Sequence, residues 1–378
     1  MFELTDEQQL TRTSVREFAE AEVKPLAAEI DHEHRPPLET IPKLGELGLL
    51  GMLIPEQYGG SAMDSVSYCI AIEELSRCCA TTGVLVEAHS SLCSWPIVHF
   101  GTEEQKQKYL PGLASGQTMG SFGLTEPNAG SDAGNTATTA KRVGDEFVIN
   151  GQKIFITNGG FAKTFVIFAR STDAPGTHGV SAFIVDRDTP GFTVGEPEHK
   201  MGIRGSSTAT LMFNDVHIPA SNLLGKEGQG FPIAMQTLEG GRTGIAAQAV
   251  GIAQGAFEAA VEYAKQRVQF GKPIAALQAI QWMIADMATD IEAGRMLVYA
   301  AADKDDRHES IALASSIAKL YCGEMATRVA GKAIQIHGGV GYTEAYPVER
   351  AYRDAKITEI YEGTNEVQRL VISRAFLR

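Results

Sequence analysis

The stretch FGLTEPNAGSD, Phe122 to Asp132, lies where the pattern of the chain changes from helical to extended. Before it, residues 5 to about 115 contain helix-initiating capping boxes at Thr5-x-x-Gln8 and Thr102-x-x-Gln105. After it, β-branched and aromatic runs alternate with glycines and prolines as far as Leu224. The stretch therefore marks the junction between a helical first third and a β middle third.

Beyond this junction, EFVINGQKIFI (146–156) suggests two strands joined at Asn150-Gly151, a pair typical of hairpin turns. From about Phe231, apolar residues recur every three or four positions, which predicts a long helix that stops at Phe270-Gly271-Lys272-Pro273. Helices continue to the C-terminus, and their alanine-rich faces favour a bundle. We predict a multi-domain α+β fold: an N-terminal α-helical domain (1–118), a β-barrel-like middle domain (119–226) and a C-terminal four-helix bundle (227–378).

Composition excludes several classes of partner. The formal net charge of the 378 residues is -13, whereas nucleic acids and anionic membranes attract basic surfaces. The N-terminus lacks the basic and apolar segments of an export signal, and no apolar run is long enough to span a bilayer. We expect a soluble protein with no nucleic-acid partner and no membrane insertion. The five cysteines match no zinc spacing and favour reduced core thiols, without a metal site.

Several nucleotide and hydrolase motifs are absent. There is no G-x-S-x-G elbow, Walker A loop, H-E-x-x-H pair, or G-x-G-x-x-G opening a helix after a strand. A dinucleotide would therefore bind without a Rossmann fold.

Two strand-like segments could form one wall of a cofactor site. Phe122 and Leu124 alternate with Gly123 and Thr125, so a short strand could lie against a ring while Thr125 and Ser131 donate hydrogen bonds; a plain loop explains the turn residues too. In KIFITNGG (153–160), regular alternation puts Phe155 and Thr157 on one face, as a cross-strand core pair also would.

The segment YEGTNEVQ (361–368) contains Glu362, either a solvated loop carboxylate or a base held by a sharp turn. Gly363 permits such a turn, and Thr364 can cap the helix that follows. The helix N-terminus would lower the pKa of Glu362, whereas desolvation by a bound apolar group would raise it. Arg267 ends a long helix, where a cation commonly serves the helix dipole. Gln335, in an apolar helix, would need a partner for a buried amide.

Together FGLTEPNAGSD, ITNGG and ERAYRDAKITEIYEGTNEVQRLVI resemble the acyl-CoA dehydrogenase family, most closely its short-chain, butyryl-CoA branch, from about Leu4 to the C-terminus. The resemblance implies an FAD enzyme in which Glu362 removes the α-proton of an acyl-CoA as a hydride leaves the β-carbon for flavin N5. The product is a trans-2-enoyl-CoA. Charge on the thioester oxygen would be stabilised by the Glu362 backbone N–H and a flavin ribityl hydroxyl.

The resemblance also assigns contacts, with Thr157 near flavin N5 and part of the FAD held by a neighbouring subunit of a homotetramer. The FAD contacts are Phe122, Leu124, Thr125, Ser131, Phe155, Ile156, Thr157, Arg267, Phe270, Gln278, Gln335, Ile336, His337, Gly338, Gly339, Thr364, Asn365 and Glu366. The acyl-CoA contacts are Ser131, Glu239, Gly240, Gly241, Arg242 and Gly363. The implied electron acceptor is electron-transferring flavoprotein, although Phe155 stands where most relatives have tryptophan.

Substrate and base follow from two local comparisons. The segment from Gly83 to Cys93 aligns with the acyl-pocket helix and is one residue shorter than in the medium-chain branch, so we expect C4 to C6 substrates. Glu87 near the pocket would repel a terminal carboxylate and disfavour glutaryl-CoA. Some branches place the base directly before the arginine that matches Arg242; here that residue is Gly241, so Glu362 is the single predicted base.

Four alternatives remain. They are an acyl-CoA oxidase, a branched-chain dehydrogenase, a dehydrogenase of carrier-protein thioesters, and a non-catalytic family member used for binding or assembly. An acyl-CoA oxidase would be expected to have an extra C-terminal domain, which this sequence does not show. A non-catalytic family member would be expected to have lost its base. We expect a bacterial-type cytoplasmic location, or the mitochondrial matrix for a processed form.

Overall fold

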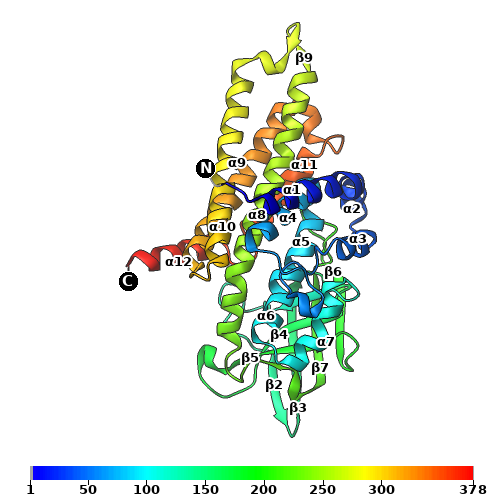
Figure 1. Cartoon of the computed structure of the whole chain (residues 1–378), viewed down its shortest axis with the longest axis vertical. Helices are drawn as coiled ribbons and strands as arrows, with labels where there is room; N and C mark the ends of the chain where they lie inside the picture. The colour runs from blue at the N-terminus through cyan, green and yellow to red at the C-terminus, as the bar shows by residue number, and fades with distance from the viewer. Residues whose placement is uncertain (1–2, 378) are drawn as a thin grey trace.

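The helix, sheet, helix order that the sequence predicts is the order of the structure (Figure 1). The computed structural model describes residues 3–377. The N-terminal helices are α1 (Asp6–Phe18), α2 (Ala27–Glu33), α3 (Ile41–Glu46), α4 (Ser65–Cys78), α5 (Ala80–Glu87), α6 (Trp95–Phe100) and α7 (Glu103–Ala114). Both predicted capping boxes are confirmed, at the start of α1 and of α7. A π-helical segment, Ala88–Ser94, joins α5 to α6.

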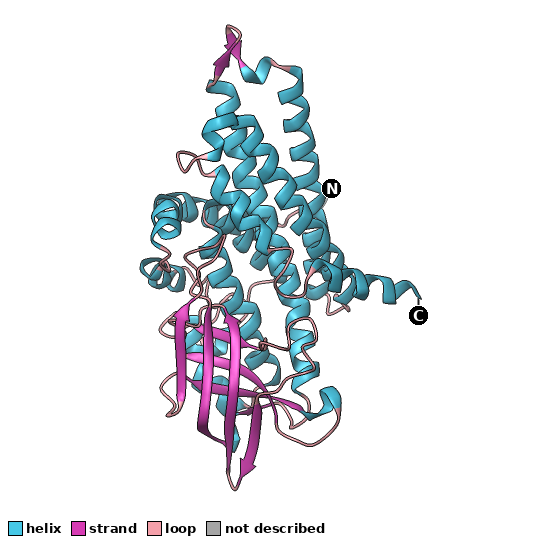
Figure 2. Ribbon diagram, turned by 180° about the vertical axis from the view of Figure 1, so that it is seen from behind, coloured by secondary structure: helices cyan, strands magenta, loops and turns pink. Residues whose placement is uncertain are grey.

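The middle of the chain forms one eight-stranded sheet in the order β6-β7-β3-β2-β4-β5-β8, with β1 parallel to β4. Its strands are β1 (Gly120–Gly123), β2 (Thr139–Val143), β3 (Glu146–Ile156), β4 (Thr164–Arg170), β5 (Val180–Asp186), β6 (Phe192–Pro197), β7 (Ala209–Pro219) and β8 (Leu223–Leu224). Figure 2 shows upright strands crossing others at a steep angle, so the sheet bends around its own core.

The predicted hairpin at Asn150-Gly151 is wrong, because β3 runs through both residues as one strand. The β2–β3 turn lies instead at Gly144, whose φ is 60°. The pairing of β3 with β7 shifts register between Ile149 and Gly151, and the Asn150 side chain donates to Asp215 Oδ1 at 3.0 Å. A Cβ at Gly151 would come 2.6 Å from Thr138 Oγ1, so glycine here permits a close approach within a bulged strand.

The C-terminal helices are α8 (Gly230–Gln266), α9 (Gln278–Asp306), α10 (Ala312–His337), α11 (Val348–Ile357) and α12 (Asn365–Leu377). The predicted long helix is confirmed as α8, and the small and aliphatic side chains of its repeating face are buried. Two short paired strands, β9 (Val268–Gln269) and β10 (Lys272–Pro273), form the turn from α8 to α9. Figure 1 shows this turn at the end of the bundle farthest from the sheet.

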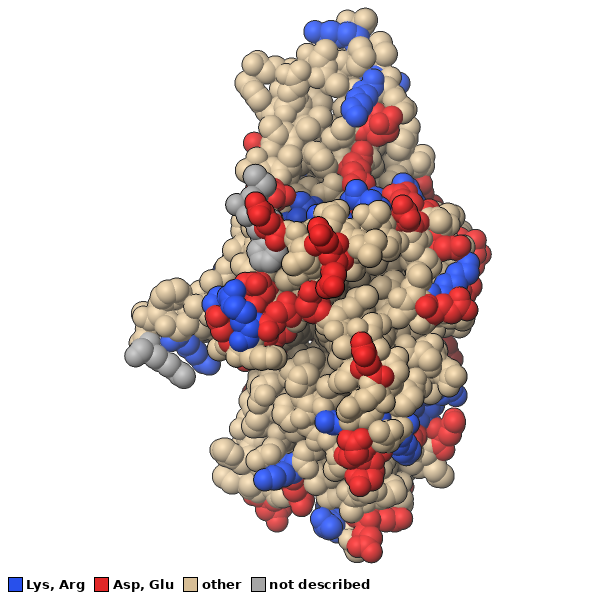
Figure 3. All heavy atoms as spheres, in the orientation of Figure 1, with Lys and Arg blue, Asp and Glu red and all other residues tan. Residues whose placement is uncertain are grey.

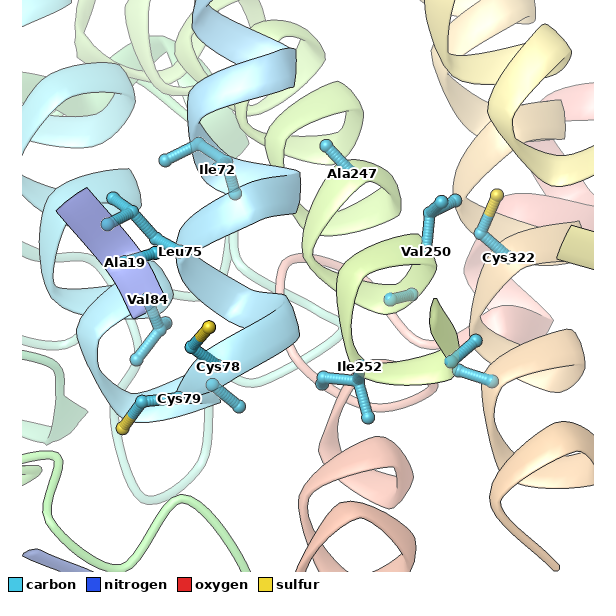
Figure 4. Close-up of a cluster of buried hydrophobic side chains, with 14 of the residues drawn as sticks. Ala19, Ile72, Leu75, Cys78, Cys79, Val84, Ala247, Val250, Ile252 and Cys322 are labelled. Carbon is cyan, nitrogen blue, oxygen red and sulfur yellow. The ribbon is translucent and has the colours of Figure 1, made fainter. Parts of the chain in front are cut away.

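Helix α8 connects the halves of the molecule, because it starts against β5 and then passes between α4 and α10 (Figure 1). Close helix packing around it requires small residues. Figure 4 shows Cys78 and Leu75 on α4, Val250 and Ile252 on α8, and Cys322 on α10 within one buried cluster. All five cysteines are free and buried, which confirms the prediction of reduced core thiols.

The surface agrees with the acidic composition. Figure 3 shows lysines and arginines dispersed among acidic side chains on the face drawn, without a continuous basic patch. Within residues 3–377, no helix combines the length and apolar character needed to cross a bilayer.

Candidate active site

The site is built around the turn that joins α11 to α12. Gly363 has φ 91° and Glu362 itself has φ 53°, so two successive residues adopt left-handed backbone conformations. The glycine was predicted, but the strain at Glu362 was not; a non-glycine residue held in this conformation is typical of functional sites. Thr364 Oγ1 accepts a hydrogen bond from Val367 N at 3.3 Å, which confirms the predicted cap of α12.

Two side chains that the sequence analysis did not identify hold this turn. Lys319 Nζ, on α10, donates to Gly363 O at 2.7 Å and to Asn365 Oδ1 at 3.3 Å. Gln368 Nε2 donates to Gly363 O at 2.9 Å. Burial lowers the pKa of Lys319 to about 8, against the opposing charge of Glu362. A lone lysine in the apolar run ALASSIAKLYC was the signal available in the sequence.

The Glu362 side chain points into the protein. The residue as a whole is partly accessible, but its Oε2 atom is buried and has no hydrogen-bond donor among the described residues. Desolvation by burial raises the pKa of Glu362 to about 7, although Glu87, Lys319 and Arg242 each act to lower it. Burial within the protein therefore already desolvates the Glu362 carboxyl, before any apolar group is bound.

Helix α8 makes room for this carboxyl at Gly241. A Cβ at this position would overlap Glu362 Oε2 and approach Leu92 Cδ2 to 2.9 Å. The position where some relatives would place a base is thus filled by the carboxyl of Glu362. The next residue, Arg242, is 7% exposed and its Nε has no partner among the described residues. Burial lowers the pKa of Arg242, whereas it raises that of nearby Glu239.

Glu87 lies against the predicted base. It is fully buried at the end of α5, and its carboxyl lies against Gly244 of α8, one helical turn from the Gly241 position that Glu362 Oε2 contacts. Ser91 Oγ donates to Glu87 Oε1 and to the Glu87 backbone O, the latter at 3.0 Å. Burial, followed by the charge of Glu362, raises the pKa of Glu87 well above its usual range.

A cavity of about 370 Å³, within the size range of small-molecule sites, reaches Ser91 but is not lined by Glu87 or Glu362 themselves. Ser91, which bonds Glu87, lines it together with Tyr68, Gly240 and Thr243. The Tyr68 hydroxyl and Thr243 Oγ1 are buried without partners among the described residues, so a ligand could satisfy them.

The wall on the sheet side contains the first cofactor candidates. Phe122 and Leu124 lie on and just after β1, and Ile154 N donates to Thr125 O at 2.9 Å, which links this segment to β3. Phe155 is 60% exposed with φ 59°, beside a register shift between Lys153 and Ile156. Regular strand alternation therefore does not hold here, and it does not place Phe155 and Thr157 on one face as predicted.

A buried ion pair anchors the same wall. Lys153 Nζ donates to Glu126 Oε1 at 2.6 Å and to Leu124 O at 3.0 Å, and Glu126 also accepts from Ala137 N and Thr138 N. This pair fixes the stretch FGLTEPNAGSD to β3. The sequence analysis missed it because its partners are far apart in the chain. Ser131 lies on the exposed part of that stretch.

The remaining cofactor candidates fall into two groups. Thr364, Asn365 and Glu366 begin α12, beside Glu362. The others lie toward the end of the bundle that carries β9 (Figure 1). There the Tyr263 ring stacks on the His337 ring, with centroids 4.4 Å apart. This far group consists of Arg267, Phe270, Gln278, Gln335, Ile336, His337, Gly338 and Gly339. Gln335 is exposed, so the expectation of a buried amide is wrong.

No cluster of His, Cys, Asp and Glu suited to a metal ion occurs among residues 3–377.

Family models match nearly the whole chain: "Acyl-CoA dehydrogenase, N-terminal domain" at residues 5–117, the middle domain at 121–216 and the C-terminal domain at 228–377. The chain is 55% identical, over 100% of both chains, to "Acyl-CoA dehydrogenase, short-chain specific" of Clostridium acetobutylicum.

Two solved structures are also similar over 100% of both chains. Butyryl-CoA dehydrogenase from Megasphaera elsdenii is 49% identical with a TM-score of 0.98. A chain in a structure described as the electron transferring flavoprotein of Acidaminococcus fermentans is 52% identical, also with a TM-score of 0.98.

Proposed function

The chain belongs to the acyl-CoA dehydrogenase family, and from that premise we propose that it oxidises C4 to C6 saturated acyl-CoA to trans-2-enoyl-CoA with Glu362 as base. It is an FAD-dependent oxidoreductase whose relatives act on short-chain acyl-CoA. The role of Glu362, the hydride step and the chain length belong to the proposal.

The buried, unpartnered Oε2 atom of Glu362 is the observation that carries the proposal. A proton next to a thioester carbonyl is weakly acidic, and an ordinary surface carboxylate is a poor base for it. Raising the pKa of Glu362 to about 7 makes the carboxylate more basic while leaving a substantial fraction ionised at neutral pH. The strained turn and Lys319 fix the direction from which this oxygen approaches a substrate.

The described residues fit FAD. Asn365 Nδ2, at the start of α12, is a buried donor without a partner, and the exposed ring of Phe155 stands beside the predicted cofactor wall. Thr125, Thr157 and Thr364 to Glu366 would hold the cofactor near Glu362. Bound there, FAD would supply the hydride acceptor for the β-hydrogen, and Glu362 would hold the α-proton.

A homotetramer would unite the two groups of cofactor residues. The far group lies toward the end of the bundle that is farthest from the sheet, so a second copy would have to bring it to the FAD that the sheet wall holds (Figure 1). Large apolar side chains near that end are exposed, including Phe270 at 89%, Tyr342 at 86% and Trp282 at 61%. Such exposure is typical of a surface covered by another chain.

Electron-transferring flavoprotein is the proposed acceptor. Phe155 presents an exposed aromatic ring at the position where the family resemblance implies a tryptophan covering the flavin face, near where electrons would leave. The similar chain in the Acidaminococcus fermentans structure supports this choice. For the location we keep the bacterial-type cytoplasm, or the matrix for a processed form, as a prediction.

Anaerobic titration of the FAD-loaded protein with butyryl-, hexanoyl-, octanoyl- and isovaleryl-CoA tests the substrate class. We expect the flavin absorbance to bleach with the two short straight chains. Bleaching by isovaleryl-CoA instead would replace the straight-chain proposal with a branched-chain one. If no CoA ester bleaches a yellow protein, the substrate proposal fails, and a carrier-protein thioester is tested next. Rapid reoxidation by oxygen would identify an oxidase.

A further inference from the structure

Two carboxyl groups occupy the space next to two glycines on one face of α8, where other residues would have side chains. Gly241 leaves room for Glu362, and Gly244, three residues later on the same face, leaves room for Glu87. A Cβ at Gly244 would come 3.0 Å from both Glu87 Cγ and Glu87 Oε1, and 2.8 Å from the Tyr68 hydroxyl. The backbone of α8 thus brings the base and a second carboxyl side by side.

The hydrogen bonds of the pair define where a proton must lie. Ser91 donates to Glu87 Oε1, so Glu87 Oε2 is the free oxygen of that carboxyl. Glu87 Oε2 and Glu362 Oε2 are both buried, and neither has another partner among the described residues. A single proton shared by two neighbouring buried carboxyls would satisfy both oxygens, whereas two ionised carboxylates side by side would repel each other without water to screen them.

The charged and titratable neighbours determine which carboxyl keeps the proton. Arg242 on α8 and Lys319 on α10 act on Glu362 and favour its ionised form. Glu87 faces the neutral hydroxyls of Ser91 and Tyr68, and Tyr361 lies beside both carboxyls. These neighbours favour a protonated Glu87 beside an ionised Glu362. A protonated Glu87 carries no charge, so the expectation that it would repel a terminal carboxylate does not hold for this form.

We propose that Glu87 is a positioning residue for the reaction: its protonated carboxyl donates a hydrogen bond to Glu362 and holds the reactive oxygen in the space left by Gly241. This inference rests on the proposed role of Glu362 as base. The hydrogen bond favours the ionised form of Glu362 and so offsets part of the effect of burial, which keeps the base available at neutral pH.

Three variants of the FAD-loaded enzyme separate positioning from packing. Glu87→Leu introduces an apolar side chain of similar volume and removes the donor, Glu87→Gln supplies an N–H donor in its place, and Val86→Ala is a core change on the same helix that serves as the control. For Glu87→Leu we expect kcat at pH 7 to fall at least about tenfold with little change in KM, the effect of one lost hydrogen bond to a charged group.

The pH profile supplies a readout that packing alone would not move. In Glu87→Leu the ascending limb of kcat/KM should shift to higher pH, because the stabilised carboxylate loses its donor. Glu87→Gln should recover most of the rate and of the pH position, and Val86→Ala should not shift the limb. The proposal is overturned if the leucine and glutamine variants behave alike, or if the limb stays in place in Glu87→Leu.

Infrared difference spectra of the free enzyme test the proton directly. At about pH 8 we expect a deuterium-sensitive band of a protonated carboxyl in the wild type that is lost in Glu87→Gln. Burial raises the pKa of Asp354 only to about 6 and that of Glu362 only to about 7, so these two groups should contribute little at this pH. Absence of that band overturns the pair even in an active enzyme. Failure of the wild type to oxidise any acyl-CoA while the band is present would instead reject the proposed function.

Discussion

Replacing Gly241 by alanine should disable the base while leaving the fold intact. The added Cβ would overlap Glu362 Oε2, come 2.9 Å from Leu92 Cδ2 and 3.2 Å from Glu362 Cδ. Since carbon atoms normally pack about 3.5 to 4.0 Å apart, the carboxyl would have to move by on the order of 1 Å. A shift of about 1 Å at a reacting group costs about a hundredfold in rate, and this is the loss we expect in kcat.

The neighbouring glycine provides the matched control. A Cβ at Gly240 would meet no atom within 4 Å, although both glycines lie in the same turn of α8. Both substitutions gain similar helix propensity, of about 1 kcal/mol, so that gain cancels between them. Because Gly240 lines the cavity and is a predicted acyl-CoA contact, the comparison uses stopped-flow rates of anaerobic flavin reduction at saturating butyryl-CoA, where a change in binding does not enter the rate. If Gly241→Ala reduces its flavin within about threefold of Gly240→Ala, Glu362 does not depend on this space and the reasoning is refuted.

Three further predictions follow from the charged groups around the turn and the sheet wall. Burial raises the pKa of Glu362 from 4.5 to about 7, so between these pH values the folded state binds more protons than the unfolded state, and the free energy of unfolding falls as pH rises. Glu362→Gln should remove this fall. In denaturant titrations at pH 8 we expect the variant to be more stable than the wild type by about 1 to 3 kcal/mol. An equal pH dependence in both proteins would contradict it. Lys319→Met removes two hydrogen bonds to the turn and a cation that favours ionised Glu362. We expect kcat to fall and the ascending limb of the pH–rate profile to shift to higher pH. If the limb does not shift, the charge of Lys319 does not stabilise ionised Glu362. Lys153→Met leaves the buried Glu126 without its cation and should lower the free energy of unfolding, measured in urea, by about 3 to 5 kcal/mol. Adding Glu126→Gln should restore part of this loss, and Lys163→Met, at an exposed ion pair, should change stability little. If the double variant regains nothing, loss of the ion pair is not the cause.

The helical parts of the fold could be predicted because their signals are local. Capping boxes at Thr5 and Thr102 fixed two helix starts, and the apolar period identified α8 through its whole buried face. Asn150-Gly151 misled because the same dipeptide that suits a tight hairpin also suits a bulge inside a strand. The local pattern does not show the contact with Thr138, which lies just before β2 and closely approaches Gly151.

At the site, the reacting residue and its turn could be predicted from the sequence, whereas the side chains that hold them in place could not. Glu362, Gly363 and Thr364 are consecutive, so a short motif predicted the turn and its cap. Lys319 and Glu87 come from helices distant in sequence, and their roles depend on which faces meet after folding. The raised pKa of Glu362 likewise depends on burial by several segments. The left-handed backbone of Glu362 has no residue-type signal, since tertiary contacts impose it.

The central claim, that Glu362 is the base, is tested most directly by anaerobic stopped-flow reduction of Glu362→Gln with butyryl-CoA, with acyl-CoA binding measured in parallel. Glutamine keeps the size of the side chain but has no basic oxygen of comparable strength. We expect binding within about tenfold of the wild type and flavin reduction slower by at least about 10²- to 10⁴-fold. A variant that binds butyryl-CoA and reduces its flavin at the wild-type rate would contradict the assignment of Glu362.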